Sequence, residues 1–570
     1  MIPRTFNLQK IAAGLILVAA VIFFILFFII KNLGGDIDDV CWRFALTKVH
    51  LMTQWQMPYF TPGRCGGFHL AADAQDFIFS AYMLMSFIIP NVTWAIKITT
   101  LLLSVVFFGG MFMWLRILGV NNSSARLYGA LITVSSGYWV YHMTQAGNLW
   151  AHGLVYAPWI MVAIERIFQK SLDNNKRQLN ILCLIGLLFL LINSGYYWLQ
   201  TAVPMITARV MVEIFDWRKP VGVRFKEVMT VGLCTLGAII LSLPRLAAIY
   251  EFQLKKFPRL GGEVSHLQVV GDNPAWLRAW LGSLFDGSII TQAKHSLGML
   301  GYFWDYTNFI GIVAAFFIGI GIVLIRKDNL NKALIALLIA ALFQLILTRT
   351  THMGDFIRMI CPLYKQITWH WRGSAIVIIA LAALMARGFQ WVMTQRREWI
   401  MRGAIVLLAA HLLQIGYVYT YHMKLSVSPA INTLMVNDHP VTKPLTNHYA
   451  PALMGYLFGY GNEHPPQLSY AHQLPIMTEI KPGFLNMHDI RLLASQRADH
   501  GYYLTHQWPL WSVKDKALLE RFVNFEQIIE PPMYVQRLIQ LSIAAWIVYG
   551  ASIIMVLFYR RKNKRNAAII

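Results

Sequence analysis

Charged side chains are scarce in this sequence. Only 13% of its 570 residues are Asp, Glu, Lys or Arg, whereas soluble domains carry about a quarter. A chain with so few charges lacks the polar surface that a soluble enzyme, a disordered protein or a fibrous protein of this length needs. Because 57% of the residues are hydrophobic and the apolar runs are long rather than alternating, the sequence predicts an all-α polytopic membrane protein.

Cysteine is also scarce, since five residues in the whole chain cannot form a disulfide framework. Cys183 and Cys234 fall in apolar runs, whereas Cys41 and Cys65 share the first polar loop, and whether these two pair stays open. Acidic residues are outnumbered by basic ones, 27 to 49, which gives a net charge of +22. The basic residues are spread between the apolar runs, which is typical of the positive-inside rule and of anionic lipids as partners, and argues against nucleic acid.

The apolar runs predict about twelve transmembrane helices. The first, residues 11–30, has about 20 residues, enough to cross a hydrocarbon core of about 30 Å, and no cleavage site follows it. The later runs lie near residues 95–115, 127–143, 151–164, 180–195, 197–212, 228–249, 307–325, 333–348, 373–393, 403–420 and 538–559. The short run of residues 77–90 ends in Pro90, so we expect it to form an interfacial or re-entrant helix.

Clusters of Lys and Arg in alternate connections predict that both termini are cytoplasmic. On this topology, residues 1–420 form a transmembrane module with a first outer loop at 31–94 and a second at 250–306. Residues 421–537 form a small extracytoplasmic cap, which we expect to be irregular. Residues 538–570 form the last transmembrane helix and a basic cytoplasmic tail.

Several segments of the first 170 residues carry a family resemblance. The first outer loop contains residues 34–39 (GGDIDD), 57–60 (MPYF) and 66–75 (GGFHLAADAQ), and residues 147–152 (GNLWAH) follow later. Together they resemble the YfhO-like family of the GT-C superfamily of polytopic membrane glycosyltransferases. Downstream, only residues 369–372 (WHWR) continue the match. His69 stands where the family usually has proline, which leaves the donor and acceptor specificity open.

The resemblance implies a GT-C-like fold and a glycosyltransferase that uses a lipid-phosphate-linked sugar. Such an enzyme moves a sugar from a polyprenyl-phosphate donor to a cell-envelope acceptor, which is a glycan, a lipid or a polymer. The expected location is the bacterial inner membrane, with the active site facing outside the cytoplasm. The sugar, the acceptor, the carrier length and the oligomeric state stay open.

Carboxylates at the outer end of the first helix are the candidate catalytic groups. Asp36 lies nearest the membrane edge and matches the family position, so we expect it to be the base that takes the acceptor proton. Asp39 is the second choice. The alternative is that these acids are ordinary solvated side chains at the end of a helix. No cofactor is obligatory. Asp36 and Asp38 also form a D-x-D pattern, which leaves a divalent metal as an open alternative without assigned metal ligands.

Arginines at the outer ends of spans are the candidate ligands for the donor phosphate. Arg245 lies about 17 residues along a helix expected to begin near residue 228, which is roughly 26 Å. The segment 349–372 holds a second cationic cluster on the outer side, where positive-inside bias does not favour it. We expect Arg372, His370 and Arg358 from this segment to bind phosphate. The alternative for Arg245 is a snorkelling side chain at a helix end.

A lipid-linked saccharide flippase or another transporter is the alternative function, followed by a noncatalytic scaffold. Transporters place paired charges or broken helices at mid-membrane, and many are built from inverted repeats. Here the ionisable clusters fall mainly in outer loops, the apolar runs are little interrupted, and no internal repeat is visible. These features favour chemistry at the outer surface.

Overall fold

The structure is a computed structural model that describes twelve stretches of the chain. They are residues 4–30, 80–89, 92–144, 149–169, 174–195, 198–250, 280–289, 308–325, 331–348, 373–395, 397–421 and 533–569. Within these stretches the secondary structure is helical and contains no strand. The first outer loop up to residue 79, most of the second, and nearly all of the expected cap lie outside the described residues.

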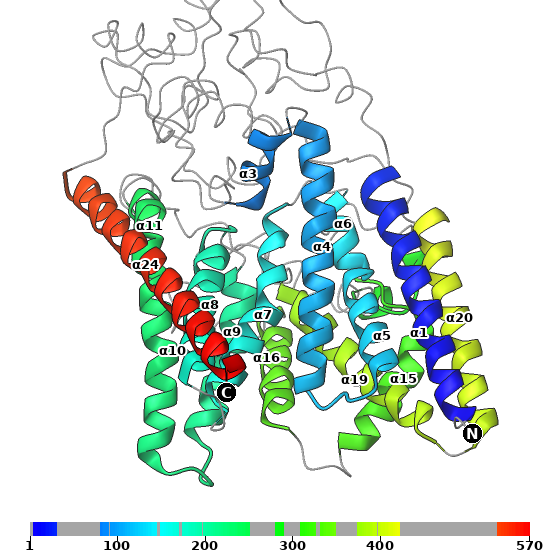
Figure 1. Ribbon diagram of the computed structural model, residues 1–570. Coiled ribbons are helices and arrows are strands. Elements are labelled where there is room, and N and C mark those ends of the chain that lie inside the picture. Colours follow the sequence, from blue (N-terminus) through cyan, green and yellow to red (C-terminus); the bar gives the residue numbers. More distant parts are fainter. Residues whose placement is uncertain are drawn as a thin grey trace, which may run out of the picture.

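The helices follow one another along the chain with short turns between many of them (Figure 1). They are α1 (Arg4–Phe24), the π-helix η1 (Ile25–Ile30), α3 (Ala81–Ile88), α4 (Val92–Ile117), α5 (Ser123–Val134), α6 (Gly137–Thr144), the 3-10 helix η2 (Leu149–Val155), α7 (Tyr156–Ile167), α8 (Asn174–Ile192), α9 (Trp198–Ile214), α10 (Val221–Leu241), α11 (Leu243–Ala248), α15 (Ile312–Ile325), α16 (Lys332–Thr348), α19 (Ala375–Met393), α20 (Glu398–Tyr421) and α24 (Met533–Ile569).

Each apolar run identified in the sequence coincides with one or two of the observed helices, which confirms the helical architecture. Within the described residues, four helices are long and apolar enough to cross a membrane: Trp94–Ile117, Ala375–Met393, Glu398–Tyr421 and Met533–Phe558. The chain is therefore an integral membrane protein, whereas the count of twelve spans stays a prediction. In the described part of the run at 77–90, residues 80–89, the helix α3 has eight residues, which at 1.5 Å per residue is too short to span.

Two expected spans are broken, which corrects the expectation of little-interrupted helices. The run at 127–143 is split between α5 and α6, and the Gly137 N–H at the break donates to Phe309 O at 2.8 Å. The run at 228–249 is split at Ser242, because Pro244 in the first turn of α11 cannot continue the hydrogen-bond ladder of α10. A proline at that position is instead favourable for starting a new helix.

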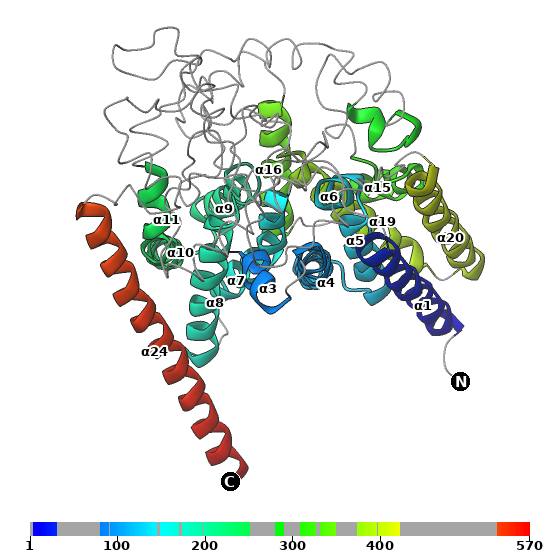
Figure 2. The same ribbon diagram turned by 90° about the horizontal axis from the view of Figure 1, so that it is seen from above.

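Helix α19 forms the centre of the helical body, where 83% of its spanning window is buried. It packs backbone to backbone against α15. A Cβ built on Gly388 would lie 2.0 Å from Phe317 O, and one on Gly321 would lie 2.2 Å from Leu384 O. Small residues allow such close approach, which replaces the hydrophobic driving force that is missing between helices in lipid. Seen from above, α24 lies at one edge of the body and α1 with α20 at the other (Figure 2).

The two ends of the helical body differ. At one end, hereafter the turn face, two hydrogen bonds lead to α19: Asn122 N, in the turn before α5, donates to Gln390 Oε1 at 2.9 Å, and Gln9 Nε2 of α1 donates to Met393 O at 3.3 Å. The turn at residues 215–220 lies at this end as well. The opposite end, hereafter the loop face, carries α3 and α11 (Figure 1), and η2 contacts α3 through the rings of His152 and Tyr82. On the predicted topology the turn face is cytoplasmic.

Candidate functional site

Arg245 is the one predicted site residue that the structure describes. Asp36, Asp39, Arg358, His370 and Arg372 all lie outside the described residues. Their roles therefore stay predictions, as does their proximity to Arg245.

Arg245 lies in α11 at the loop face, just beyond the break in α10. The expectation of one continuous helix from residue 228 is wrong, because α10 already begins at Val221 and ends before Arg245. The side chain is only 2% exposed. Its Nη1 donates to Asn193 O at 2.5 Å, so the guanidinium joins α11 to the end of α8. A solvated snorkelling arginine would not be buried in this way.

Asn193 continues the polar contacts from the end of α8. Its Nδ2 donates to Phe189 O at 2.8 Å and to Ser242 Oγ at 3.0 Å. Ser242 in turn donates to Ala238 O at 2.8 Å. Asn193 is 1% exposed, and its Oδ1 accepts no hydrogen bond from the described residues. A buried amide oxygen without a donor costs free energy, so this atom is suited to accept an O–H or N–H from a bound molecule.

A buried histidine also lies near the loop face. His152 of η2 is fully buried and packs edge-on against Tyr82 of α3, with 5.4 Å between ring centroids. The Tyr82 hydroxyl shares a hydrogen bond of 2.9 Å with Thr100 of α4. Next to His152, a Cβ on Gly153 would lie 2.2 Å from Ser194 Oγ. The absence of a side chain at Gly153 therefore lets η2 approach the end of α8.

Arg245, Asn193 and Ser242 are joined by hydrogen bonds under the loop face, and we call these three residues the Arg245 cluster. The cluster contains a cation, an amide and a hydroxyl, and none of its three members is a carboxylate. It is therefore suited to bind an anion or a polyol rather than to remove a proton from a hydroxyl. Among the described residues, no group of His, Cys, Asp and Glu could hold a metal ion.

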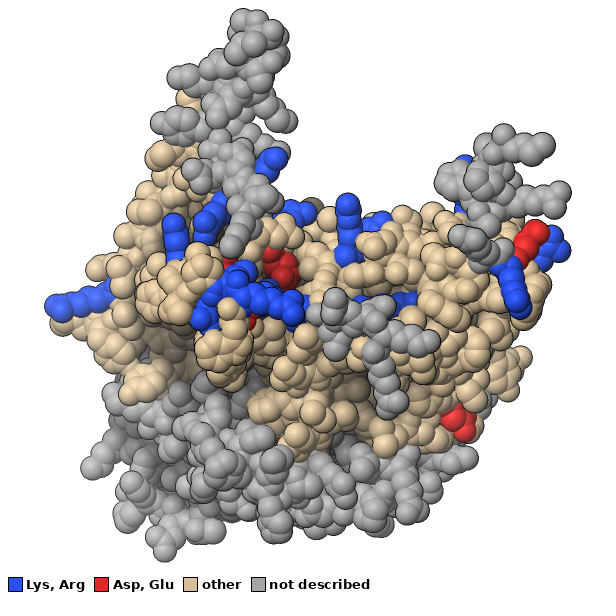
Figure 3. Space-filling model, turned by 90° about the horizontal axis from the view of Figure 1, so that it is seen from below, with Lys and Arg blue, Asp and Glu red and all other residues tan. Residues whose placement is uncertain are grey.

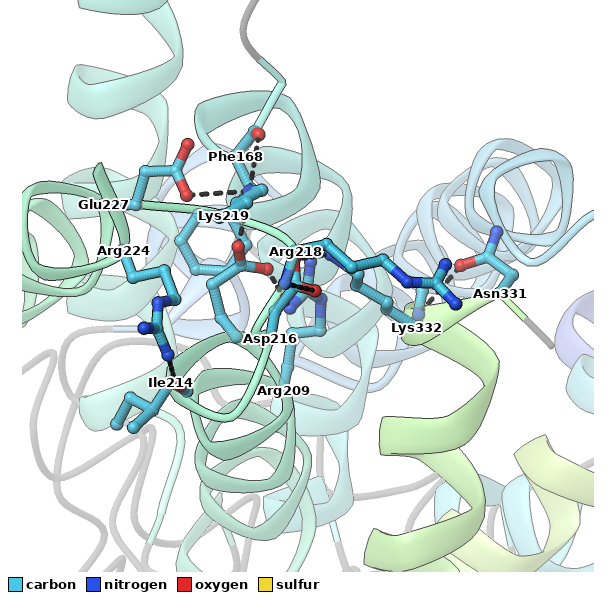
Figure 4. Close-up of polar contacts among 12 residues, drawn as sticks. Phe168, Arg209, Ile214, Asp216, Arg218, Lys219, Arg224, Glu227, Asn331 and Lys332 are labelled. Atoms are coloured by element: carbon cyan, nitrogen blue, oxygen red, sulfur yellow. Dashed lines mark hydrogen bonds and ion pairs between the residues drawn. The ribbon is translucent and has the colours of Figure 1, made fainter. Parts of the chain in front are cut away.

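Sequence reasoning missed a buried ion network at the turn face (Figure 4). Arg209 of α9 donates to both oxygens of Glu165 on α7, with Nη2 to Oε2 at 3.0 Å, and to Glu213 Oε2 at 2.8 Å. Lys219 pairs with Glu213 and, at 2.8 Å, with Glu227 of α10. The side chains of Arg209 and Glu213 are 3% and 0% exposed. The network thus ties α7, α9 and α10 together.

A second ion pair joins α16 to the same turn, between Lys332 and Asp216 (Figure 4). The hydrogen bond from Lys332 holds the pKa of the Asp216 carboxyl below its usual value, and burial opposes this shift. Burial lowers the pKa of Lys219, but its hydrogen bonds with Glu213 and Glu227 outweigh burial and raise it. Both shifts favour the charged forms of Asp216 and Lys219.

Comparisons with solved structures include a likeness to a membrane protein of known structure. No family model matches the chain, and no curated protein matches it. Among solved structures, the chain is similar to an oligosaccharyltransferase from Archaeoglobus fulgidus in the apo form, with a TM-score of 0.42 and 12% identity. The match covers 80% of this chain and 63% of the oligosaccharyltransferase chain, so the chain spans less than two thirds of that protein. A TM-score of this size carries no argument about function.

Proposed function

We propose that the chain is a membrane glycosyltransferase that moves a sugar from a polyprenyl-phosphate donor to a cell-envelope acceptor on the outer face of the membrane. The observation that carries the proposal is the burial of Arg245 beside Asn193 at the loop face. The family resemblance of the first 170 residues gives the reaction class. The acceptor is a glycan, a lipid or a polymer of the envelope.

The depth of Arg245 fits a lipid-linked donor. A phosphate cannot sink below the head groups without losing its hydration, so it must be bound at the end of a span. Arg245 is at such an end. An arginine can hold phosphate with two parallel hydrogen bonds, whereas lysine offers a point charge. The unpartnered Asn193 Oδ1 nearby could accept a hydrogen bond from a sugar hydroxyl.

The remaining roles in this proposal fall on residues outside the described part. Asp36 is the base that takes the proton of the acceptor hydroxyl, and Asp39 is the alternative. Arg372, His370 and Arg358 complete the phosphate site with Arg245. The proposal requires no cofactor. A divalent metal bound at the D-x-D pattern of Asp36 and Asp38 stays an open alternative.

Donor binding to Arg245 variants tests the proposal. Arg245→Ala should weaken binding of a purified polyprenyl-phosphate sugar by about 2 kcal/mol, since a charge-assisted hydrogen bond to a buried anion is lost. Arg245→Lys should recover only part of this loss, because lysine does not bind bidentately. Arg402→Ala is the matched control, since Arg402 is an exposed arginine on α20 paired with Glu398. Equal donor affinity in all variants would contradict the phosphate role of Arg245.

A lipid-linked saccharide flippase or transporter is the second candidate, and one observation favours it. The break between α5 and α6 interrupts a span, and broken helices are typical of transporters. In reconstituted vesicles, a transporter would move the lipid-linked saccharide across the bilayer without producing a new glycosidic bond. Formation of the glycosylated acceptor by the purified protein would separate the enzyme from the transporter.

A further inference from the structure

The turn between α9 and α10 carries apolar side chains that the protein leaves uncovered. Phe215 is 58% exposed, Trp217 82%, Val221 70% and Phe225 66%. Four large apolar side chains around one turn would be unfavourable in water, whereas aromatic residues favour the boundary between acyl chains and head groups. This turn therefore lies at the depth of the lipid head groups on the turn face.

Three cations in the same segment have no acidic partner among the residues that the structure describes. Arg218, Arg224 and Lys226 form no ion pair within the described residues. The carboxylates close to them in sequence are engaged elsewhere: Glu213 with Arg209 and Lys219, Asp216 with Lys332, and Glu227 with Lys219. These acids therefore neutralise Arg209, Lys219 and Lys332. The positive charges of Arg218, Arg224 and Lys226 remain available to another anion. Figure 3 shows Lys and Arg side chains gathered on this face of the molecule.

The guanidinium of Arg224 is held in place by two neutral groups. Its Nη1 donates to the main-chain oxygen of Ile214, and its Cζ lies 5.5 Å from the centre of the Trp217 ring. Neither partner is an acid. Its buried Nε has no acceptor within the described part of the chain. A guanidinium held by a carbonyl and an aromatic ring is oriented in advance, so little side-chain entropy is lost when an anion binds.

We propose that the α9–α10 turn is a binding site for an anionic phospholipid, whose phosphate contacts Arg218, Arg224 and Lys226 while its acyl chains cover Trp217 and Phe225. The combination of unneutralised cations with exposed aromatic side chains on one turn selects this occupant. A soluble anion would leave the aromatic surface uncovered, and a zwitterionic lipid would leave the net charge unbalanced. The site lies at the turn face, away from the Arg245 cluster.

Lipid binding to the full-length protein tests the site. Binding of phosphatidylglycerol to the protein in neutral detergent is measured by native mass spectrometry, with phosphatidylcholine as the reference lipid. Each cation near an anionic surface contributes about fivefold in affinity, so Arg224→Gln should weaken phosphatidylglycerol binding about fivefold and the triple variant Arg218→Gln, Arg224→Gln, Lys226→Gln about a hundredfold. Phosphatidylcholine binding should not change.

Arg402→Gln is the control, because Arg402 is an exposed arginine that already pairs with Glu398 at 2.8 Å. This control should bind phosphatidylglycerol like the parent. Equal weakening in Arg224→Gln and Arg402→Gln would overturn the site, because it would indicate a general response to net charge. Displacement of the lipid by an equal concentration of glycerol phosphate would also overturn it, since the site would then recognise a soluble anion.

A second measurement does not depend on removing a charge. Brominated phosphatidylglycerol should quench part of the tryptophan fluorescence, and the conservative variant Trp217→Phe should lose that part while keeping its thermal unfolding midpoint. Unchanged quenching in Trp217→Phe would contradict contact between the lipid and this turn, even if the charge variants failed to fold.

Discussion

Removing Arg209 should destabilise the protein more than removing both Arg209 and its acidic partner. The guanidinium makes three hydrogen bonds, two to Glu165 and one to Glu213. In Arg209→Met, Glu213 keeps Lys219 as a partner, but the Glu165 side chain, 10% exposed, loses its ion pair. An uncompensated buried charge of this kind costs about 3–5 kcal/mol of the free energy of unfolding.

The double variant Arg209→Met with Glu165→Gln removes the charge that the single variant leaves behind. It should recover most of the loss, because replacing a buried ion pair by neutral groups is often close to neutral in free energy. Arg402→Met is the control on an exposed pair, with an expected cost of about 1 kcal/mol or less. The assay is denaturant unfolding in detergent micelles. The reasoning would be refuted if Arg209→Met were no worse than Arg402→Met, or if the double variant were worse than the single.

Two further predictions concern acid stability and topology. Folding lowers the pKa of Asp216, so its stabilisation is present above the unfolded pKa of about 4 and is lost as the pH falls through the lower folded pKa. The unfolding midpoints of the parent and of Asp216→Asn should therefore differ at pH 6 and approach each other as the pH falls below about 4. A difference that stays constant with pH would contradict the ion pair. For the topology, single cysteines are introduced at Asn447 and at Asp328 in a cysteine-free background, and intact cells are labelled from outside. Only the cysteine at Asn447 should react. Equal reactivity of the two cysteines would contradict the predicted topology.

Sequence reasoning located the helices because long apolar runs depend only on local composition. The helix breaks were not predicted, because mean hydropathy hardly changes at a kink inside an apolar run. Pro244 gives a local signal for one of the two breaks. The ion network was missed for a different reason. Arg209 stands inside the apolar run 197–212, with Glu213 one helical turn later, which was a usable signal. Its bidentate partner Glu165 is 44 residues away, and only tertiary packing brings the two together.

The central claim is transfer of a sugar from a lipid phosphate, and Asp36 is its most direct test. Asp36→Asn keeps the shape of the side chain and removes the proton acceptor, and loss of a positioned base costs about 10² to 10⁴ in rate. The measurement is glycosylated product formed per minute from a purified polyprenyl-phosphate sugar, with Asp39→Asn assayed in parallel and donor binding checked for each variant. The account predicts that Asp36→Asn binds the donor normally and transfers at least about a hundredfold more slowly. Parental transfer rates in both Asp36→Asn and Asp39→Asn would contradict the glycosyltransferase mechanism.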